Sequence, residues 1–123
     1  MICLDTNYLI GALVAGSPES VRIAEWIHGN DPIILPAVAW YEFLCGSSEE
    51  EERLASALVT HGIHPFGDDE ARQASRLFKL LHKPRILRVD AMIAGTAMAA
   101  GARLATNNRG DFKRFVSLGL LLA

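Results

Sequence analysis

In the stretch MICLDTNYLIGAL, at positions 1–13, an apolar segment ends on a carboxylate, and this arrangement indicates how the chain begins to fold. Its first four residues are apolar without polar alternation, which is typical of a strand that is covered on both faces. Asp5, Thr6 and Asn7 follow, and a second apolar stretch predicts a short helix. A carboxylate at the end of a buried strand either caps the helix that follows or contributes to a functional site.

The rest of the chain alternates short apolar segments with helical patterns. Further strands are predicted at 33–35, 63–66 and 103–106, and the closing LGLLLA (118–123) predicts a fifth. Asp68 or Asp69 is expected to cap a helix that ends before Pro84, and Asp90 to start an apolar helix. This alternation predicts a single α/β domain over residues 1–123, with three α/β/α layers and a mostly parallel, roughly five-stranded sheet.

Composition limits the class of protein. Half of the 123 residues are apolar and 21% are charged, which fits a globular domain with a full core. No apolar run reaches the roughly 18–20 residues that cross a bilayer, and the start lacks a signal-peptide pattern, so we expect a cytoplasmic protein without membrane contact. Cys3 and Cys45 lie in apolar surroundings outside any C-x-x-C pair and are expected to be free, buried thiols.

The charge of the chain is unevenly distributed. The net charge is only −2, but the segment 71–89 contains no acidic residue and six of the twelve basic ones. This basic stripe is either a surface that binds an anion such as a nucleic-acid backbone or a solvated helix face. Its members are Arg72, Arg76, Lys79, Lys83, Arg85 and Arg88.

Three aspartates are expected to meet at one edge of the sheet. Asp5 ends the first strand, Asp90 begins the helix that leads to the fourth, and Asp111 follows that strand after a short loop. In an open parallel sheet, ligands bind beyond the carboxyl ends of the strands. Glu42 is a fourth acid of interest, because its helical neighbours are apolar and no lysine or arginine lies nearby in sequence.

Each of the four acids has a simpler interpretation when it is taken alone. Asp5 and Asp90 have the position of helix caps, Asp111 that of a solvated turn residue, and Glu42 that of an exposed helix residue. Together, however, the four carboxylates would repel one another and raise one another's pKa. A divalent cation offsets this repulsion, and carboxylates without histidine or cysteine favour Mg²⁺ or Mn²⁺ over zinc. The pattern predicts metal-assisted cleavage of a phosphodiester, by one ion or two, with the basic stripe on its backbone.

Four segments in this order resemble the signature segments of PIN-domain ribonucleases, closest in style to the VapC toxins of toxin–antitoxin pairs. They are LDTN at 4–7, YEF at 41–43, RVDAMIAGTA at 88–97 and LATNNRGDF at 104–112. The resemblance implies an endoribonuclease that depends on Mg²⁺, or on Mn²⁺ in its place, and that a cognate antitoxin inhibits. It implies a homodimer or a larger toxin–antitoxin assembly as well.

The same resemblance implies a role for each matched residue. Asp5, Asp90 and Asp111 would hold the cation directly or through water, and Glu42 would complete the set and orient the attacking water. The supporting polar residues would be Asn7, Thr106 and Asn108.

Two other functions are compatible with parts of the sequence. A phosphatase with Asp5 as nucleophile would usually have a second aspartate two positions later, where this chain has Asn7. A non-catalytic PIN-like module that binds RNA or a protein would not need four mutually repelling acids.

Overall fold

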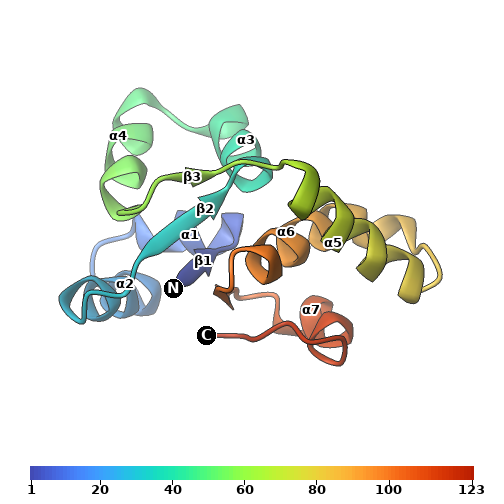
Figure 1. The fold of residues 1–123 in the computed structure, drawn as a ribbon. Helices are drawn as coiled ribbons and strands as arrows, with labels where there is room; N and C mark the ends of the chain where they lie inside the picture. Colours follow the sequence, from blue (N-terminus) through green and yellow to red (C-terminus); the bar gives the residue numbers. More distant parts are fainter.

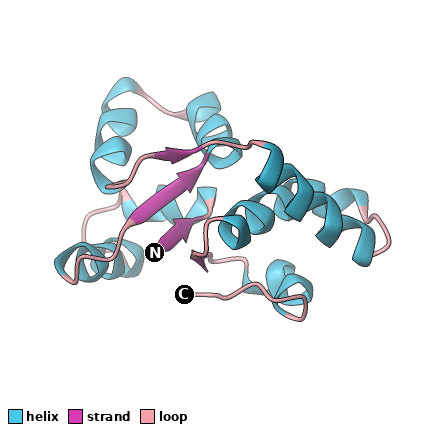
Figure 2. Ribbon diagram, viewed as in Figure 1, coloured by secondary structure: helices cyan, strands magenta, loops and turns pink.

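The computed structural model describes residues 1–123 and has a parallel sheet of four strands in the order β3-β2-β1-β4 (Figures 1 and 2). The central strand β1 therefore has neighbours on both sides. The predicted α/β architecture with a parallel sheet is confirmed. The strands are β1 (Ile2–Leu4), β2 (Ile33–Pro36), β3 (Ile63–His64) and β4 (Arg103–Ala105).

Seven α-helices cover the two faces of the sheet. Side chains of β1 alternate between two cores: Ile2 and Leu4 belong to one, and Cys3 to the other. The first core is completed by α1–α4 and the second by α5–α7, which gives the expected three layers. The helices are α1 (Thr6–Ala12), α2 (Pro18–His28), α3 (Ala37–Gly46), α4 (Glu49–Leu58), α5 (Asp68–Leu80), α6 (Arg88–Ala99) and α7 (Arg109–Val116).

The predicted fifth strand is reduced to a single bridge between Leu104 and Leu122. Leu120 donates its N–H to the carbonyl of Phe115 at 3.1 Å, so the chain first wraps around the end of α7. Only the last three residues then run beside β4, where Ala123 donates to Leu104 at 2.8 Å.

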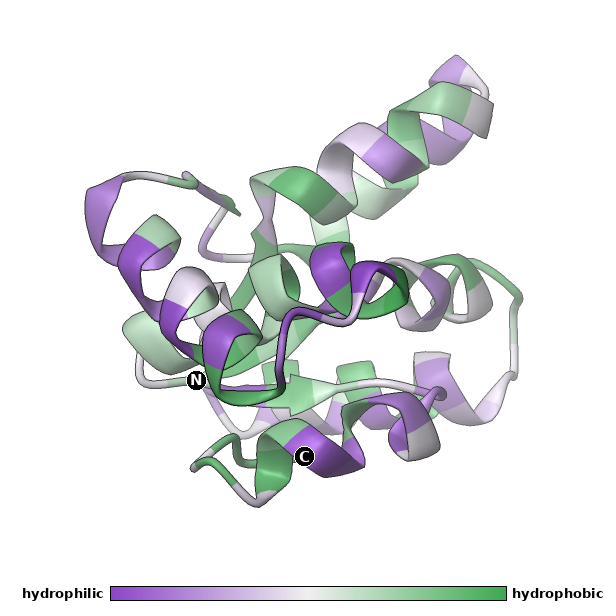
Figure 3. Cartoon of the chain, turned by 90° about the vertical axis from the view of Figure 1, so that its right-hand side faces the viewer, coloured by the Kyte–Doolittle hydropathy of each residue, from purple (hydrophilic) through white to green (hydrophobic).

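Helices α5 and α6 pack very closely and extend away from the sheet (Figure 1). Gly95 of α6 makes this possible, because a Cβ at this position would lie 2.6 Å from the backbone nitrogen of Ala74. Figure 3 shows that the strands in the middle of the molecule are mainly hydrophobic, whereas most helices carry both hydrophobic and hydrophilic turns. None of the helices has both the length and the apolar character that a membrane crossing requires.

Three local expectations were wrong. Gly67, not an aspartate, occupies the N-cap of α5, and the backbone N–H of Gly67 donates a hydrogen bond to Glu70 Oε1 at 2.9 Å. Helix α6 begins at Arg88 because a 3₁₀ turn (Arg85–Leu87) leads directly into it, so Asp90 lies within its first turn. Of the two free cysteines, Cys3 is buried but Cys45 is exposed.

Candidate metal centre

Asp5 is held rigidly at the carboxyl end of β1. Its side chain is almost fully buried, and both carboxylate oxygens accept hydrogen bonds. Oδ1 accepts from the backbone N–H of Thr6, and Oδ2 from the hydroxyl of Thr106, each at 2.8 Å. The backbone N–H of Asp5 donates to Ala105 on β4 at 2.9 Å. Asp5 therefore caps α1 and also faces the edge where β1 and β4 end. A role as a helix cap and a role in a functional site are thus compatible for this residue.

Thr106 connects Asp5 to the loop that leads into α7. Its hydroxyl donates to Asp5 and accepts the backbone N–H of Asn108 at 2.9 Å. Asn108 thus supports Thr106 through its backbone N–H, while its side chain forms no capping hydrogen bond with α7. Asn7 is exposed and forms no side-chain hydrogen bond. Asp111 is exposed and lies in the first turn of α7, which begins at Arg109, rather than in a loop.

Glu42 lies on α3, and its partner is a residue that sequence reasoning missed. The hydroxyl of Thr6 donates to Glu42 Oε1 at 2.9 Å. Glu42 is exposed, so the apolar neighbours in sequence do not enclose its carboxylate. Because 36 positions separate the two residues, no local pattern indicates the contact. Thr6 bonds Asp5 through its N–H and Glu42 through its hydroxyl, and so joins two of the acids.

Asp90 is coupled electrostatically to the other three acids. Its side chain is half-buried on α6, and its pKa is raised to about 6. Burial is the largest cause, followed by the negative charges of Asp5, Asp111 and Glu42. Desolvation and repulsion act in the same direction here, because both disfavour the charged form of a carboxyl group.

Asp5 shows the same coupling, opposed by its hydrogen bonds. Burial raises its pKa most, and the charges of Glu42 and Asp111 raise it further. The hydrogen bonds from Thr106 and Thr6 lower it, because they stabilise the ionised form. The four acids therefore form one electrostatic group, which we call the acidic centre: Asp5, Glu42, Asp90 and Asp111.

The acidic centre suits a hydrated divalent cation. The two ion pairs in the structure, His64–Glu70 and Arg72–Asp68, involve none of its members, so no side-chain cation offsets its charge. No three acidic, histidine or cysteine side chains are grouped tightly enough to enclose an ion directly. Mg²⁺ tolerates this arrangement, because it usually keeps several waters and binds through one or two carboxylates.

The contribution of Asp90 to the stability of the metal-free protein is expected to decrease as the pH rises from 3.8 to about 6. Below pH 3.8 this carboxyl is neutral in both the folded and unfolded states, and between 3.8 and about 6 only the folded state retains the proton. Above that range the folded state bears the full cost of the charged group. Thermal unfolding in chelator, at pH values across this range, should show wild type losing stability relative to Asp90→Asn as the pH rises.

Asp69→Asn is the matched control, because it removes a charge from an exposed position on α5. It should retain the pH dependence of wild type. If the unfolding temperatures of wild type and Asp90→Asn depended on pH in the same way, the raised pKa of Asp90 in the folded state would be contradicted.

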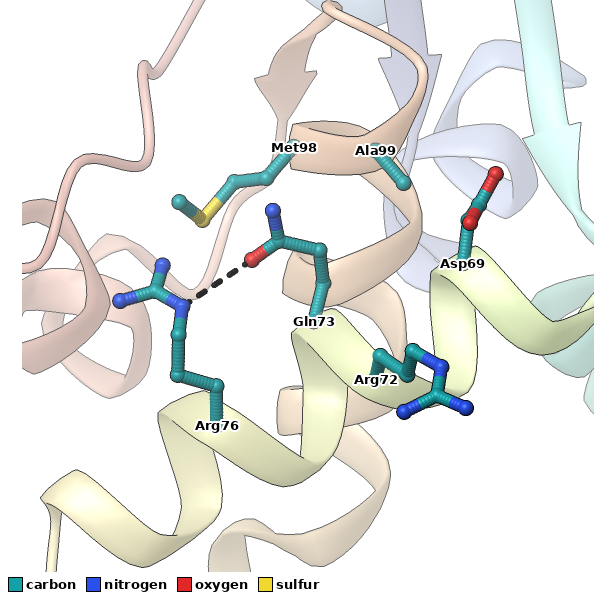
Figure 4. Close-up of a pocket in the computed structure, with 6 residues that line it drawn as sticks. All are labelled: Asp69, Arg72, Gln73, Arg76, Met98 and Ala99. Carbon is teal, nitrogen blue, oxygen red and sulfur yellow. Dashed lines mark hydrogen bonds between the residues drawn. The ribbon is translucent and has the colours of Figure 1, made fainter.

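The basic stripe lies on α5, on the turn after it and at the start of α6, and all six side chains are exposed. Arg72 pairs with Asp68 at 2.8 Å, and Arg76 Nε donates to Gln73 at 3.2 Å. Both arginines line an open pocket of about 400 Å³ between α5 and the end of α6 (Figure 4). No member of the acidic centre lines this pocket. The guanidinium of Arg88 lies 5.6 Å from the ring centroid of Phe78.

Comparisons with known proteins place the chain among similar sequences and folds. The PIN domain model matches residues 2–117. The chain is 32% identical to Ribonuclease VapC1 of Rickettsia felis, over 98% of this chain and 94% of the relative. A solved VapBC2 complex of Rickettsia felis, bound to a promoter DNA fragment, has the same fold at a TM-score of 0.78 and 24% identity, covering 100% and 98% of the two chains. A toxin–antitoxin complex from Klebsiella pneumoniae matches at a TM-score of 0.66 and 27% identity, over 91% and 90%.

Proposed function

The chain belongs to the PIN domain family, and from this membership we propose that it is a Mg²⁺-dependent endoribonuclease. The observation that carries the proposal is the acidic centre, in which four carboxylates are coupled and no side-chain cation offsets them. A relative named as a ribonuclease, similar over nearly its whole length, supports the same activity.

In this proposal each acid has a defined task. Asp5 and Asp90, with Asp111, hold the cation directly or through water, and Glu42 orients the attacking water. When bound by these residues, Mg²⁺ or Mn²⁺ would supply a Lewis acid for a phosphoryl oxygen and would lower the pKa of a nearby water. Thr106 holds Asp5 by its hydroxyl, as described above.

The substrate is proposed to be RNA, whose backbone the basic stripe would hold by charge. Six exposed cations on one helical hairpin would release counterions when phosphates bind, so affinity should fall steeply with salt. We propose as well that the protein acts in the cytoplasm.

The proposed partner is a small antitoxin protein, in a homodimer or a larger toxin–antitoxin assembly. Two of the similar structures are toxin–antitoxin or VapBC complexes, which supports such a partner. An antitoxin segment that placed an arginine at the acidic centre would form charge-assisted hydrogen bonds with its carboxylates. Undiminished cleavage after mixing with the candidate antitoxin would count against this inhibition.

The test of the activity is cleavage of a structured RNA pool by purified protein with Mg²⁺ or Mn²⁺, beside Asp90→Asn prepared identically. Cuts by the wild type alone that disappear with chelator are the expected result, and the variant controls for contaminating nuclease. If both proteins gave the same cuts, or if wild type bound RNA with Mn²⁺ but did not cleave it, the nuclease proposal would fail. The second result would favour the alternative, a non-catalytic binding module.

A further inference from the structure

The loop between β4 and α7 is attached to the rest of the molecule by a side-chain contact outside the acidic centre. Asn107 Nδ2 donates a hydrogen bond to Glu19 Oε1 at 2.9 Å. Glu19 lies in the first turn of α2, 88 positions away in sequence. Asn107 stands between Thr106, whose hydroxyl bonds Asp5, and Asn108, whose N–H bonds that hydroxyl. The contact therefore acts on the same short segment that supports the acidic centre.

The position of the Glu19 carboxylate depends on a glycine in α1. A Cβ at Gly11 would lie 2.9 Å from Glu19 Cδ and 3.2 Å from Oε1, so any larger residue would displace the carboxylate. The turn between the two helices is fixed at the same place, because the hydroxyl of Ser17 donates to the carbonyl of Gly11 at 2.7 Å. The pKa of Glu19 is lowered by its own backbone N–H, then by Asn107, so the acceptor is ionised at neutral pH.

We propose that Glu19 is a positioning residue that, through Asn107, holds the loop 106–108 and the first turn of α7, so that Thr106 and Asp111 keep their places in the acidic centre. Glu19 is not a ligand in this proposal; it acts on the loop through its hydrogen bond with Asn107. The proposal rests on the function proposed above, because it assigns the loop to a cation-binding centre.

Three variants separate the contact from general stability. Glu19→Ala removes the acceptor, and Glu19→Gln retains an oxygen that Asn107 can reach. Gly11→Ala leaves Glu19 in the chain but displaces its carboxylate. Alanine is also favoured over glycine in a helix by about 1 kcal/mol, so this variant should unfold no more easily than wild type.

The first measurement is hydrogen exchange of the metal-free protein at the amides of Asn108, Asp111 and Phe112, all of which are hydrogen-bonded. The second is Mn²⁺ affinity, from the free ion counted by electron paramagnetic resonance. Glu19→Ala and Gly11→Ala should exchange faster at these amides and bind Mn²⁺ about 5–10-fold more weakly, as the loss of one charge-assisted hydrogen bond predicts. Glu19→Gln should lie between wild type and Glu19→Ala in both measurements, because its amide oxygen can accept the hydrogen bond from Asn107 without the negative charge.

The outcomes distinguish this proposal from the proposed function. If hydrogen exchange were unchanged in Glu19→Ala and Gly11→Ala, the role proposed for Glu19 would be overturned. Faster exchange with unchanged Mn²⁺ affinity would also overturn it, because the contact would then have only a structural role. A wild-type protein that binds Mn²⁺ but cleaves no RNA would defeat the nuclease activity, while the exchange and affinity results would still decide the role of Glu19.

Discussion

Asp5→Asn is expected to lower RNA cleavage by about 100-fold or more while the protein stays folded. The change removes one charge from the acidic centre, and metal-ion catalysis contributes several kcal/mol, at about 1.4 kcal/mol for each factor of ten in rate. Folding should survive, because asparagine can still accept the N–H of Thr6, and the hydroxyl of Thr106 can turn to accept from its amide. The metal-free variant should be at least as stable as wild type, since a buried carboxylate with a raised pKa is gone.

The measurement compares cleavage rates at saturating Mg²⁺ and unfolding temperatures in chelator and in Mg²⁺. Added Mg²⁺ should raise the unfolding temperature of wild type but not of Asp5→Asn, because only the wild type binds the ion well. Asp69→Asn, the same chemical change at an exposed site on α5, should keep the wild-type response of the unfolding temperature to Mg²⁺. A folded Asp5→Asn protein with unchanged turnover would rule out the metal-dependent mechanism.

The strands could be predicted from the sequence because their burial is a local property. Ile2–Leu4 and Ile33–Pro36 are short apolar runs, and residues of this kind occupy a sheet that is covered on both faces. The closing LGLLLA has the same apolar character but mostly wraps around the end of α7. Apolar composition alone predicts burial, and it does not distinguish a strand from the packing of a helix end.

The contacts that fix the acids could not be predicted, because they join residues far apart in sequence. Thr6 with Glu42 and Glu19 with Asn107 are separated by 36 and 88 positions. The topology places strand ends at one edge, but the choice of hydroxyl or amide partner depends on side-chain directions that only the folded chain defines. Helix starts were also misplaced by one or two residues, as at α6, where a 3₁₀ turn replaces the expected cap.

Gly95→Ala is expected to lower the free energy of unfolding by about 2 kcal/mol, because the new methyl group has no room between α5 and α6. The added Cβ would lie 2.6 Å from the nitrogen and 2.8 Å from the Cα of Ala74, and these backbone atoms can move only if the helices separate. Separation would loosen Leu77 and Ala91 in the second core and shift Asp90 within the acidic centre. The loss should exceed the roughly 1 kcal/mol that alanine gains over glycine in a helix.

Urea unfolding of the metal-free protein measures this loss, and Gly46→Ala is the matched control. Gly46 ends α3, and a Cβ there would meet no atom within 4 Å, so its replacement should change stability by less than about 0.5 kcal/mol. Because Gly95→Ala moves the helix that carries Asp90, it should also weaken Mn²⁺ binding, which Gly46→Ala should leave unchanged. A Gly95→Ala protein as stable as wild type would mean that α5 and α6 can separate at little cost, and the position of Asp90 would then depend on α6 and the sheet rather than on the pairing with α5.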